Sequence, residues 1–326
     1  MQTPIVKTVK KLKLLAASVT LITASFAASA DIHFLIPGGP GGGWDTTARS
    51  VGEAMMKSGI DNRASFQNMS GGGGGRAIAY LLEIGNKRGD MLMVNSTPIV
   101  IRALSGSIPN SHHDLAPVAN LIADFGAFAV RHDSPLTTWQ QVIEQLKQNP
   151  SSLRVAGGSA RGSMDHLVAA QAIAAAGLDG RRLRYIPYDA GGEAKAGLLS
   201  GEVEILSTGL SEALELANAG QARILAITSE EPIAEYPELP TLKSLGYDMS
   251  FINWRGFFAS PDTSAEKIAQ YNEQFVKLLQ TPEWEEVRKR NGWINMYLPA
   301  ADFKAMLDEQ ETELKQVMLD LGFIRK

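Results

Sequence analysis

The chain has 326 residues, a formal net charge of −4 and no cysteine, and 44% of its residues are hydrophobic while 20% are charged. This composition excludes an intrinsically disordered chain, a disulfide scaffold and a zinc or iron–sulfur site with cysteine ligands. A general nucleic-acid binder would be basic, which this chain is not. The length suits roughly two domains, each with its own core.

The first 30 residues have the pattern of a secretory signal peptide. They contain four lysines and no acid, then an apolar run over residues 14–26, and end in Ala28-Ser29-Ala30. An amphipathic first helix or a membrane anchor is the alternative, but the run is shorter than the roughly 20 residues that a membrane span needs. We expect cleavage after Ala30 and export to the periplasm. Loss of four lysines changes the charge from −4 to −8, and no cysteine follows to carry a lipid.

The remaining chain alternates between strand and helix patterns. In chain order, strands are expected at residues 32–36, 64–68, 91–95, 153–156, 184–187, 203–207, 222–228 and 251–259, with extended segments at 115–122 and 126–130. Helices are expected at residues 45–57, 76–84, 138–148, 164–176, 193–200, 211–219, 265–280, 282–291 and 300–321. Alternating units of this kind predict an α/β fold with mostly parallel sheets flanked by helices.

The order of these elements predicts two lobes. The first combines residues 31–122 with 253–326, and the second holds residues 123–252. The chain would cross between the lobes near Ile122 and near Asn253. Each lobe opens with the same series of strand, glycine-rich loop and helix.

The first glycine-rich loop, PGGPGGGWDTTAR at residues 37–49, predicts an anion site. Glycine lets the backbone approach a ligand closely, and the first amides of the following helix have no partner inside the helix. These amides and the helix dipole favour a negative charge. We expect Asp45 to be the N-cap and Thr46 to add a hydroxyl. The alternative is a flexible surface turn without a ligand.

The second loop, GGSARGSMDH at residues 157–166, repeats this arrangement. Ser159 and Ser163 add hydroxyls. Arg161 either binds a carboxylate through two hydrogen bonds of its guanidinium or is a solvated surface charge. We expect His166 to be a packing or capping residue and Asp165 to be a structural acid of the first helical turn.

Other motifs point away from catalysis and metal binding. The run Gly71–Gly75 matches a dinucleotide pattern only loosely, and we expect it to form a cleft wall or a packing turn. No Walker A motif or G-x-S-x-G motif is present. The pair His112-His113 lies in a polar turn, where we expect a solvated loop rather than a metal site. The sequence therefore predicts no catalytic residues, no metal and no cofactor.

The chain resembles the extracytoplasmic solute-binding proteins of tripartite tricarboxylate transporters, the Bug-type receptors. The similarity runs over nearly all of the chain after residue 30. The similarity rests on the order and spacing of several motifs. These are the two loops above, then IPYDAGG (186–192), LSGEVE (199–204), GQARILA (220–226), PELPT (237–241) and WRGFFASP (254–261).

The resemblance implies a two-lobe, type II periplasmic binding fold whose glycine-rich loops face each other and hold a carboxylate through amides, hydroxyls and waters. Many relatives have an aspartate where this chain reads Ser207-Thr208-Gly209, and its absence here favours plain polycarboxylates over amino acids. Carried over to this sequence, the ligand-binding residues are Gly38, Gly39, Gly41, Gly42, Gly43, Trp44, Asp45, Thr46, Thr97, Gly158, Ser159, Ala160, Arg161, Gly162, Ser163, Tyr188, Gly191 and Thr208.

We therefore predict a periplasmic, monomeric receptor for a small organic di- or tricarboxylate such as citrate. It would pass this ligand to the membrane subunits of a tripartite tricarboxylate transporter and would bind no nucleic acid. A ligand-sensing adaptor for a sensor kinase is the main alternative, since it would use the same pocket. A periplasmic enzyme that uses the glycine-rich loops is a second alternative, but the sequence offers it no nucleophile–base pair.

Overall fold

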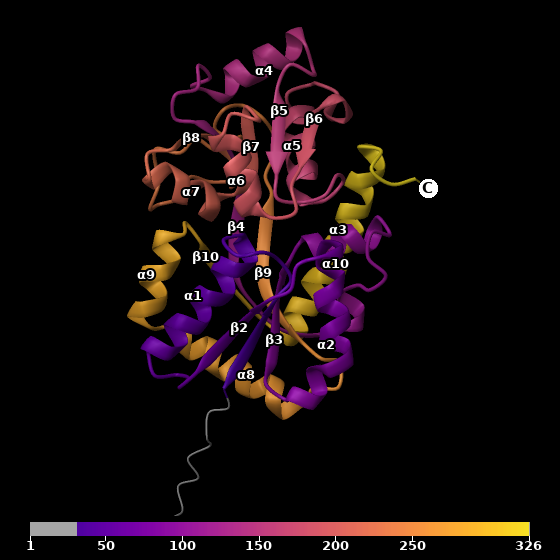
Figure 1. Ribbon diagram of the computed structural model, residues 1–326, viewed down its shortest axis with the longest axis vertical. Coiled ribbons are helices and arrows are strands. Elements are labelled where there is room, and N and C mark those ends of the chain that lie inside the picture. Colours follow the sequence, from indigo (N-terminus) through magenta and orange to yellow (C-terminus); the bar gives the residue numbers. More distant parts are fainter. Residues whose placement is uncertain (1–30, 326) are drawn as a thin grey trace, which may run out of the picture.

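The computed structural model describes residues 31–325, so the expected signal peptide lies outside the described residues. Two α/β lobes are connected by long strands that run from one lobe to the other (Figure 1). The first lobe begins with β1 (Ile32–Ile36), α1 (Gly43–Lys57), β2 (Ala64–Asn68), α2 (Gly75–Arg88), β3 (Met91–Ser96) and α3 (Pro98–Leu104). Short 3₁₀ turns lie at Gly72–Gly74, His112–Asp114 and Gly180–Arg182.

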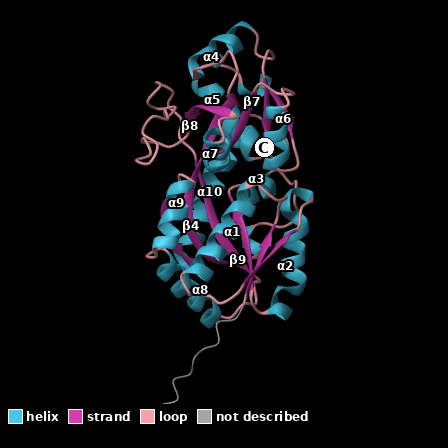
Figure 2. Cartoon of the chain, turned by 60° about the vertical axis from the view of Figure 1, so that its left-hand side comes forward, coloured by secondary structure: helices cyan, strands magenta, loops and turns pink. Residues whose placement is uncertain are grey.

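The second lobe follows β4 (Ala116–Arg131), which enters it from the first. It contains α4 (Trp139–Gln148), β5 (Arg154–Gly157), α5 (Met164–Ala175), β6 (Arg184–Pro187), α6 (Gly191–Leu199), β7 (Ile205–Gly209), α7 (Leu210–Asn218) and β8 (Ala222–Ile227). The chain then returns to the first lobe through β9 (Ile252–Ala259), α8 (Ala265–Leu278), α9 (Pro282–Arg290), β10 (Ile294–Pro299) and α10 (Ala300–Asp320). Figure 2 shows β4 and β9 in the lower lobe with helices around them.

The strands form a mixed sheet in the order β2-β1-β3-β9-β4-β7-β5-β6, and β8 and β10 both pair with β4. Parallel pairs join β1 to β2 and β3, and β5 to β6 and β7. Among the described strands, every antiparallel pair contains β4 or β9, the strands that run between the lobes. The partner of β4 changes from β9 at Phe125 to β7 at Gly126, which places the crossing there.

Strand β4 is continuous, whereas the sequence predicted two extended segments separated at residues 123–125. The polar residue in that gap, Asp124, is fully buried and paired with Arg255 on β9. The amide of Gly126 donates to Thr228 Oγ1 over 2.7 Å. Because the charge is neutralised and the glycine amide has a partner, neither residue interrupts the strand.

Two further elements escaped prediction. Helix α3 begins with a proline, which suits a first helical position, but its run PIVIRAL is too apolar to show a helical period. Strand β10 has only partly buried and exposed residues, so its sequence shows little apolar signal. It forms because β4 offers an edge in the first lobe, where Ile294 pairs with Ala123.

Three hydrophobic clusters form the core of the two lobes. One cluster packs against the part of the sheet in the first lobe and includes Phe34, Phe257 and Trp284. A second cluster lies within the second lobe around Leu206 and Leu214. The largest joins residues of both lobes, with Trp254, Phe303 and Trp139 among its buried rings. Among the described helices, none combines the length and the hydropathy required to cross a membrane.

Candidate ligand-binding site

A cavity of about 660 Å³ opens between the two lobes. This volume lies within the range of about 300–1,000 Å³ that is usual for small-molecule sites. Of the residues predicted to bind a ligand, those that line the cavity are Gly38, Gly39, Gly42, Gly43, Trp44, Gly158, Ser159, Ala160, Arg161, Tyr188, Gly191 and Thr208. The lining does not include Gly41, Asp45, Thr46, Thr97, Gly162 or Ser163.

The first loop is held in place from behind by Asp45. The N-cap of α1 is Gly42, so the prediction that Asp45 caps this helix is wrong. Asp45 instead sits in the first turn, where Oδ2 accepts the amide of Gly41 over 2.9 Å and Oδ1 accepts Arg49 and Asn68. Gly41 has a φ of 74°, which an L side chain rarely adopts. Asp45 therefore supports the loop rather than facing the cavity.

The start of α1 faces the cavity together with the guanidinium of Arg255. A Cβ on Gly43 would lie only 2.7 Å from Cζ of Arg255, so glycine is required for this approach. Arg255 donates to Asp124 Oδ2 over 2.6 Å, and both side chains are almost fully buried. Asp124 compensates the charge of Arg255, and the free amides at the start of α1 add donors beside it.

Arg102 on α3 bridges the two lobes at the cavity. It is 7% exposed, and its Nε donates to Ser163 Oγ of the second loop over 3.1 Å. Its Nη1 donates to the carbonyl of Gly73, and its guanidinium lies 5.9 Å from the ring centre of Trp44. Burial lowers the pKa of Arg102 from its ordinary value. Because burial removes water from the guanidinium, an anion that binds beside it in the cavity stabilises its charged form.

The second loop is fixed by Tyr185 and by the helix that follows it. The Tyr185 hydroxyl donates to the carbonyl of Ser159 over 2.7 Å, and Arg161 donates to the carbonyl of Tyr185. Arg161 is exposed at the rim of the cavity. His166 accepts the amide of Gly162 and stacks on the ring of Tyr185, which is the packing and capping role that the sequence indicates. Burial lowers the pKa of His166 to about 4, so its ring is neutral at pH 7.

Three acids, Asp165, Asp189 and Glu212, line the cavity, although the segment 207–209 contains none. Burial, and then the charge of Glu212, raise the pKa of Asp165 to about 7. Burial also raises the pKa of Glu212, whose Oε2 accepts Thr208 Oγ1 over 3.1 Å. Asp165 is therefore more than a structural acid of a helical turn. In their protonated forms, these carboxyl groups can donate hydrogen bonds to ligand oxygens.

Asn253 offers the cavity an amide without a partner. The side chain is 1% exposed, and neither of its amide atoms has a hydrogen-bond partner among residues 31–325. The Oε1 atom of Glu212 likewise has none among these residues. Buried polar groups normally find partners, so these atoms are positioned for groups of a bound molecule.

Comparisons with known proteins identify the family of the chain. Residues 87–323 match the model of the family described as "Tripartite tricarboxylate transporter family receptor". This chain belongs to that family. A UPF0065 protein encoded in the tcbD–tcbE intergenic region of Pseudomonas sp. strain P51 is 26% identical over 302 residues, which cover 89% of this chain and 86% of the relative.

Solved structures show the same fold. The Rhodopseudomonas palustris protein MatC, with bound malate, superposes with a TM-score of 0.76 at 19% identity, covering 88% of the receptor and 98% of MatC. A second R. palustris protein, solved with adipate, gives a TM-score of 0.81 at 20% identity, covering 90% and 97% of the two chains. The receptor therefore has the two-lobe, type II periplasmic binding fold that its sequence predicts, in a family of solute-binding proteins.

Sequence reasoning missed Arg102, Arg255, Glu212 and Asn253 as cavity residues. A signal existed for the two arginines, because each interrupts an apolar run, PIVIRAL at 98–104 and WRGFFA at 254–259. Arginine is almost never fully buried unless it is paired. Such an interruption marks a buried charge with a partner, but it does not say where that partner lies.

Proposed function

We propose that the receptor captures a small organic di- or tricarboxylate in the cavity between its lobes and binds it without chemical conversion. It acts as a monomer in the periplasm and delivers the ligand to the membrane subunits of a tripartite tricarboxylate transporter. Family membership supports the receptor role. The malate and adipate in two proteins of the same fold support dicarboxylates as the ligand class.

The observation that carries this proposal is the set of cations at the cavity. Arg102, Arg161 and Arg255 all line it. Asp124 compensates Arg255, which leaves Arg102 and Arg161 for two carboxylates. The raised pKa values of Asp165 and Glu212 reduce the opposing negative charge. The local charge is thus suited to an anion, even though the chain as a whole is acidic.

Backbone amides where the loops meet the helices add to this attraction from both lobes. The start of α1 and the turn before α6 line the same cavity, and a helix start favours a negative charge. Closure of the lobes on a ligand brings both sets of donors to it. Citrate, with three carboxylates and a hydroxyl, can use the arginines, the amides and the unpartnered Asn253 together.

A thermal-shift screen tests the ligand class. It compares citrate, tricarballylate, C4-dicarboxylates, amino acids, sugars and NAD. A true ligand at 100 times its Kd should stabilise the protein by about 2.7 kcal/mol. Arg182→Ala removes an exposed arginine outside the cavity and serves as the control. Stabilisation by NAD or sugars alone would contradict the proposal.

Delivery to a transporter needs a separate experiment in cells. Uptake of the labelled ligand is measured with the wild-type receptor, with no receptor, and with a variant that does not bind. We expect uptake only with the wild type. Unchanged uptake without the receptor would refute delivery while leaving the binding result intact, and would favour a sensing role.

A further inference from the structure

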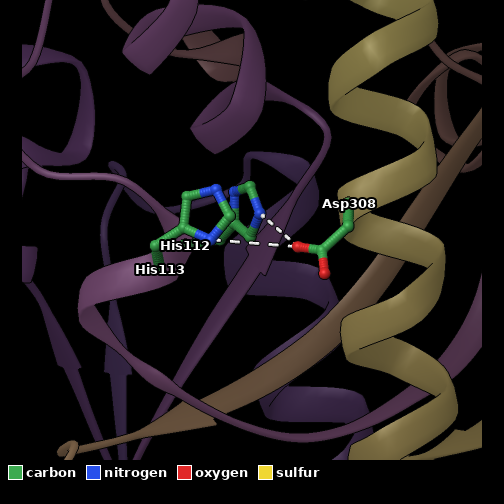
Figure 3. Close-up of side chains that lie close together, drawn as sticks. All are labelled: His112, His113 and Asp308. Atoms are coloured by element: carbon green, nitrogen blue, oxygen red, sulfur yellow. Dashed lines mark ion pairs between the residues drawn. The ribbon is translucent and has the colours of Figure 1, made fainter.

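The structure contains a second cluster of ligating side chains, away from the cavity. The turn His112–Asp114 brings two imidazoles to the side of α10, where Asp308 faces them (Figure 3). Glu311 lies on the same helix, within 4.0 Å of both rings. None of these residues lines the ligand cavity. The sequence predicted a solvated loop here, and that expectation is wrong for His112, which is 2% exposed.

We propose that His112, His113 and Asp308 form a binding site for a divalent transition-metal ion, with Zn²⁺ the ion that this donor set suits best. Two imidazoles and a carboxylate are ligands that Zn²⁺ accepts, and three protein ligands leave a fourth position for water. The site joins the turn before β4 to the C-terminal helix.

The distances fit such an ion. His112 Nε2 lies 3.6 Å from Asp308 Oδ1, and His113 Nδ1 lies 3.8 Å from the same oxygen. The ligand atoms of the three residues all lie within 4.8 Å of one another. A tetrahedral ion with bonds of about 2.0–2.1 Å separates its ligands by about 3.3 Å. Rotation of the half-exposed side chains of His113 and Asp308 can close this small difference.

His112 is the observation that points to a ligand. Its ring is buried, and neither ring nitrogen has a hydrogen-bond partner among the described residues. Asp308 Oδ1 lies beyond hydrogen-bond length from Nε2 but at a suitable separation for a shared ion.

Glu311 supplies the outer contact that metal-binding histidines usually have. Its Oε2 lies 2.9 Å from His113 Nε2. A hydrogen on Nε2 would leave the lone pair of Nδ1 directed toward Asp308. Carboxylate contacts of this kind fix the tautomer and orientation of a ligating ring. Asp308 and Glu311 supply the negative charge that a cation needs.

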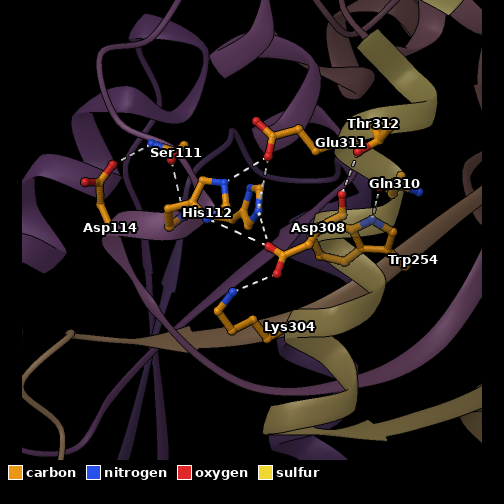
Figure 4. A network of polar contacts seen from close by, with 10 residues as sticks. Ser111, His112, Asp114, Trp254, Lys304, Asp308, Gln310, Glu311 and Thr312 are labelled. Carbon is orange, nitrogen blue, oxygen red and sulfur yellow. Dashed lines mark hydrogen bonds and ion pairs between the residues drawn. The ribbon is translucent and has the colours of Figure 1, made fainter. Parts of the chain in front are cut away.

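Both halves of the site are held in place before any ion binds (Figure 4). The Ser111 side chain accepts the amide of His113, and Asp114 accepts the amide of Ser111, which forms a capping box around the turn. On α10, Gln310 accepts the indole of Trp254 over 2.6 Å.

Lys304 binds the other oxygen of Asp308. Its Nζ donates to Oδ2 over 2.7 Å, which leaves Oδ1 for the ion. One oxygen of the Asp308 carboxylate therefore stays available for a metal.

Zinc titration of the untagged protein tests the proposal, after treatment with a chelator, by calorimetry and by thermal shift. We expect one Zn²⁺ per chain and a rise in melting temperature. Co²⁺ bound in its place should show the visible absorption of a tetrahedral site. Asp308→Asn and His113→Ala should each weaken Zn²⁺ binding about tenfold or more, and Glu311→Ala about 10- to 100-fold.

Two control variants should leave Zn²⁺ binding unchanged. Asp302→Asn removes an exposed acid from the same helix, and His132→Ala removes an exposed histidine elsewhere, so both should bind Zn²⁺ like the wild type. The decisive variant is Asp308→Asn, because its side chain is 44% exposed and the change should not disturb folding. Equal Zn²⁺ affinity in Asp308→Asn and the wild type, or no saturable binding, would overturn the proposal.

Discussion

The strongest prediction concerns Arg102, because this buried cation lines the ligand cavity from one lobe and contacts the other. Arg102→Met removes the guanidinium and keeps an apolar stem of similar length. The change deletes the donor to Ser163 Oγ and to the Gly73 carbonyl, and any charged hydrogen bond to a ligand. A hydrogen bond to a charged group contributes about 1.5–3 kcal/mol. Polycarboxylate affinity should therefore fall about 10- to 150-fold.

Isothermal titration calorimetry well below the melting temperature measures this loss directly. Stability of the ligand-free protein should fall by about 1–2 kcal/mol, because the buried Ser163 Oγ and the carbonyl of the exposed Gly73 both lose a donor. Ser163→Ala removes the contact across the lobes but leaves the guanidinium, so it should reduce affinity less. Arg182→Met is the control for an exposed arginine. Unchanged affinity in Arg102→Met would refute the assignment of this residue to the ligand.

Three further predictions test other parts of the site. Arg161→Ala should weaken carboxylate binding by about 1.5–3 kcal/mol in calorimetry, and unchanged affinity would limit Arg161 to holding the Tyr185 carbonyl. Folded Asp165 keeps its proton up to a pKa of about 7, whereas an unfolded aspartate loses it near 3.8. As pH rises between these values, the free energy of unfolding of the wild type should therefore fall relative to that of Asp165→Asn, by at most about 1.4 kcal/mol per pH unit. Urea denaturation at several pH values measures this difference. A difference independent of pH would contradict the raised pKa. Gly158→Ala places a Cβ 2.5 Å from the Cα of Gly191 and should cost about 1–3 kcal/mol of stability, with Gly42→Ala, which meets only ordinary contacts, as the milder comparison.

Local patterns in the sequence predicted most of the elements, with boundaries within a few residues. The strand at Ile32–Ile36 and the helix that ends at Lys57 appear as expected, because alternation, glycine turns and helical spacing act over short stretches of chain. The glycine-rich loops were likewise visible, since their backbone requirements are written into consecutive residues. Nine of the twelve predicted ligand-binding residues that line the cavity belong to these two loops.

Asp45 and Thr97 show the limit of that reasoning. Asp45 is in the first turn of α1 and Thr97 is the N-cap of α3, so both lie beside the cavity, yet both are buried and neither lines it. A motif places a loop near a ligand, but which of its side chains faces inward depends on hydrogen bonds such as those from Gly41 and Asn68 to Asp45.

The sequence by itself thus determined the alternation of elements, the glycine-rich loops and the family. Only the tertiary structure decided which charges meet. Arg255 pairs with Asp124 across 131 positions of sequence, and His113 meets Glu311 across 198. The burial of Arg255 and Asp124 and the pKa of Asp165 depend on what packs around these groups from distant segments. That packing creates the electrostatics of the cavity and of the histidine cluster, and no local pattern encodes it.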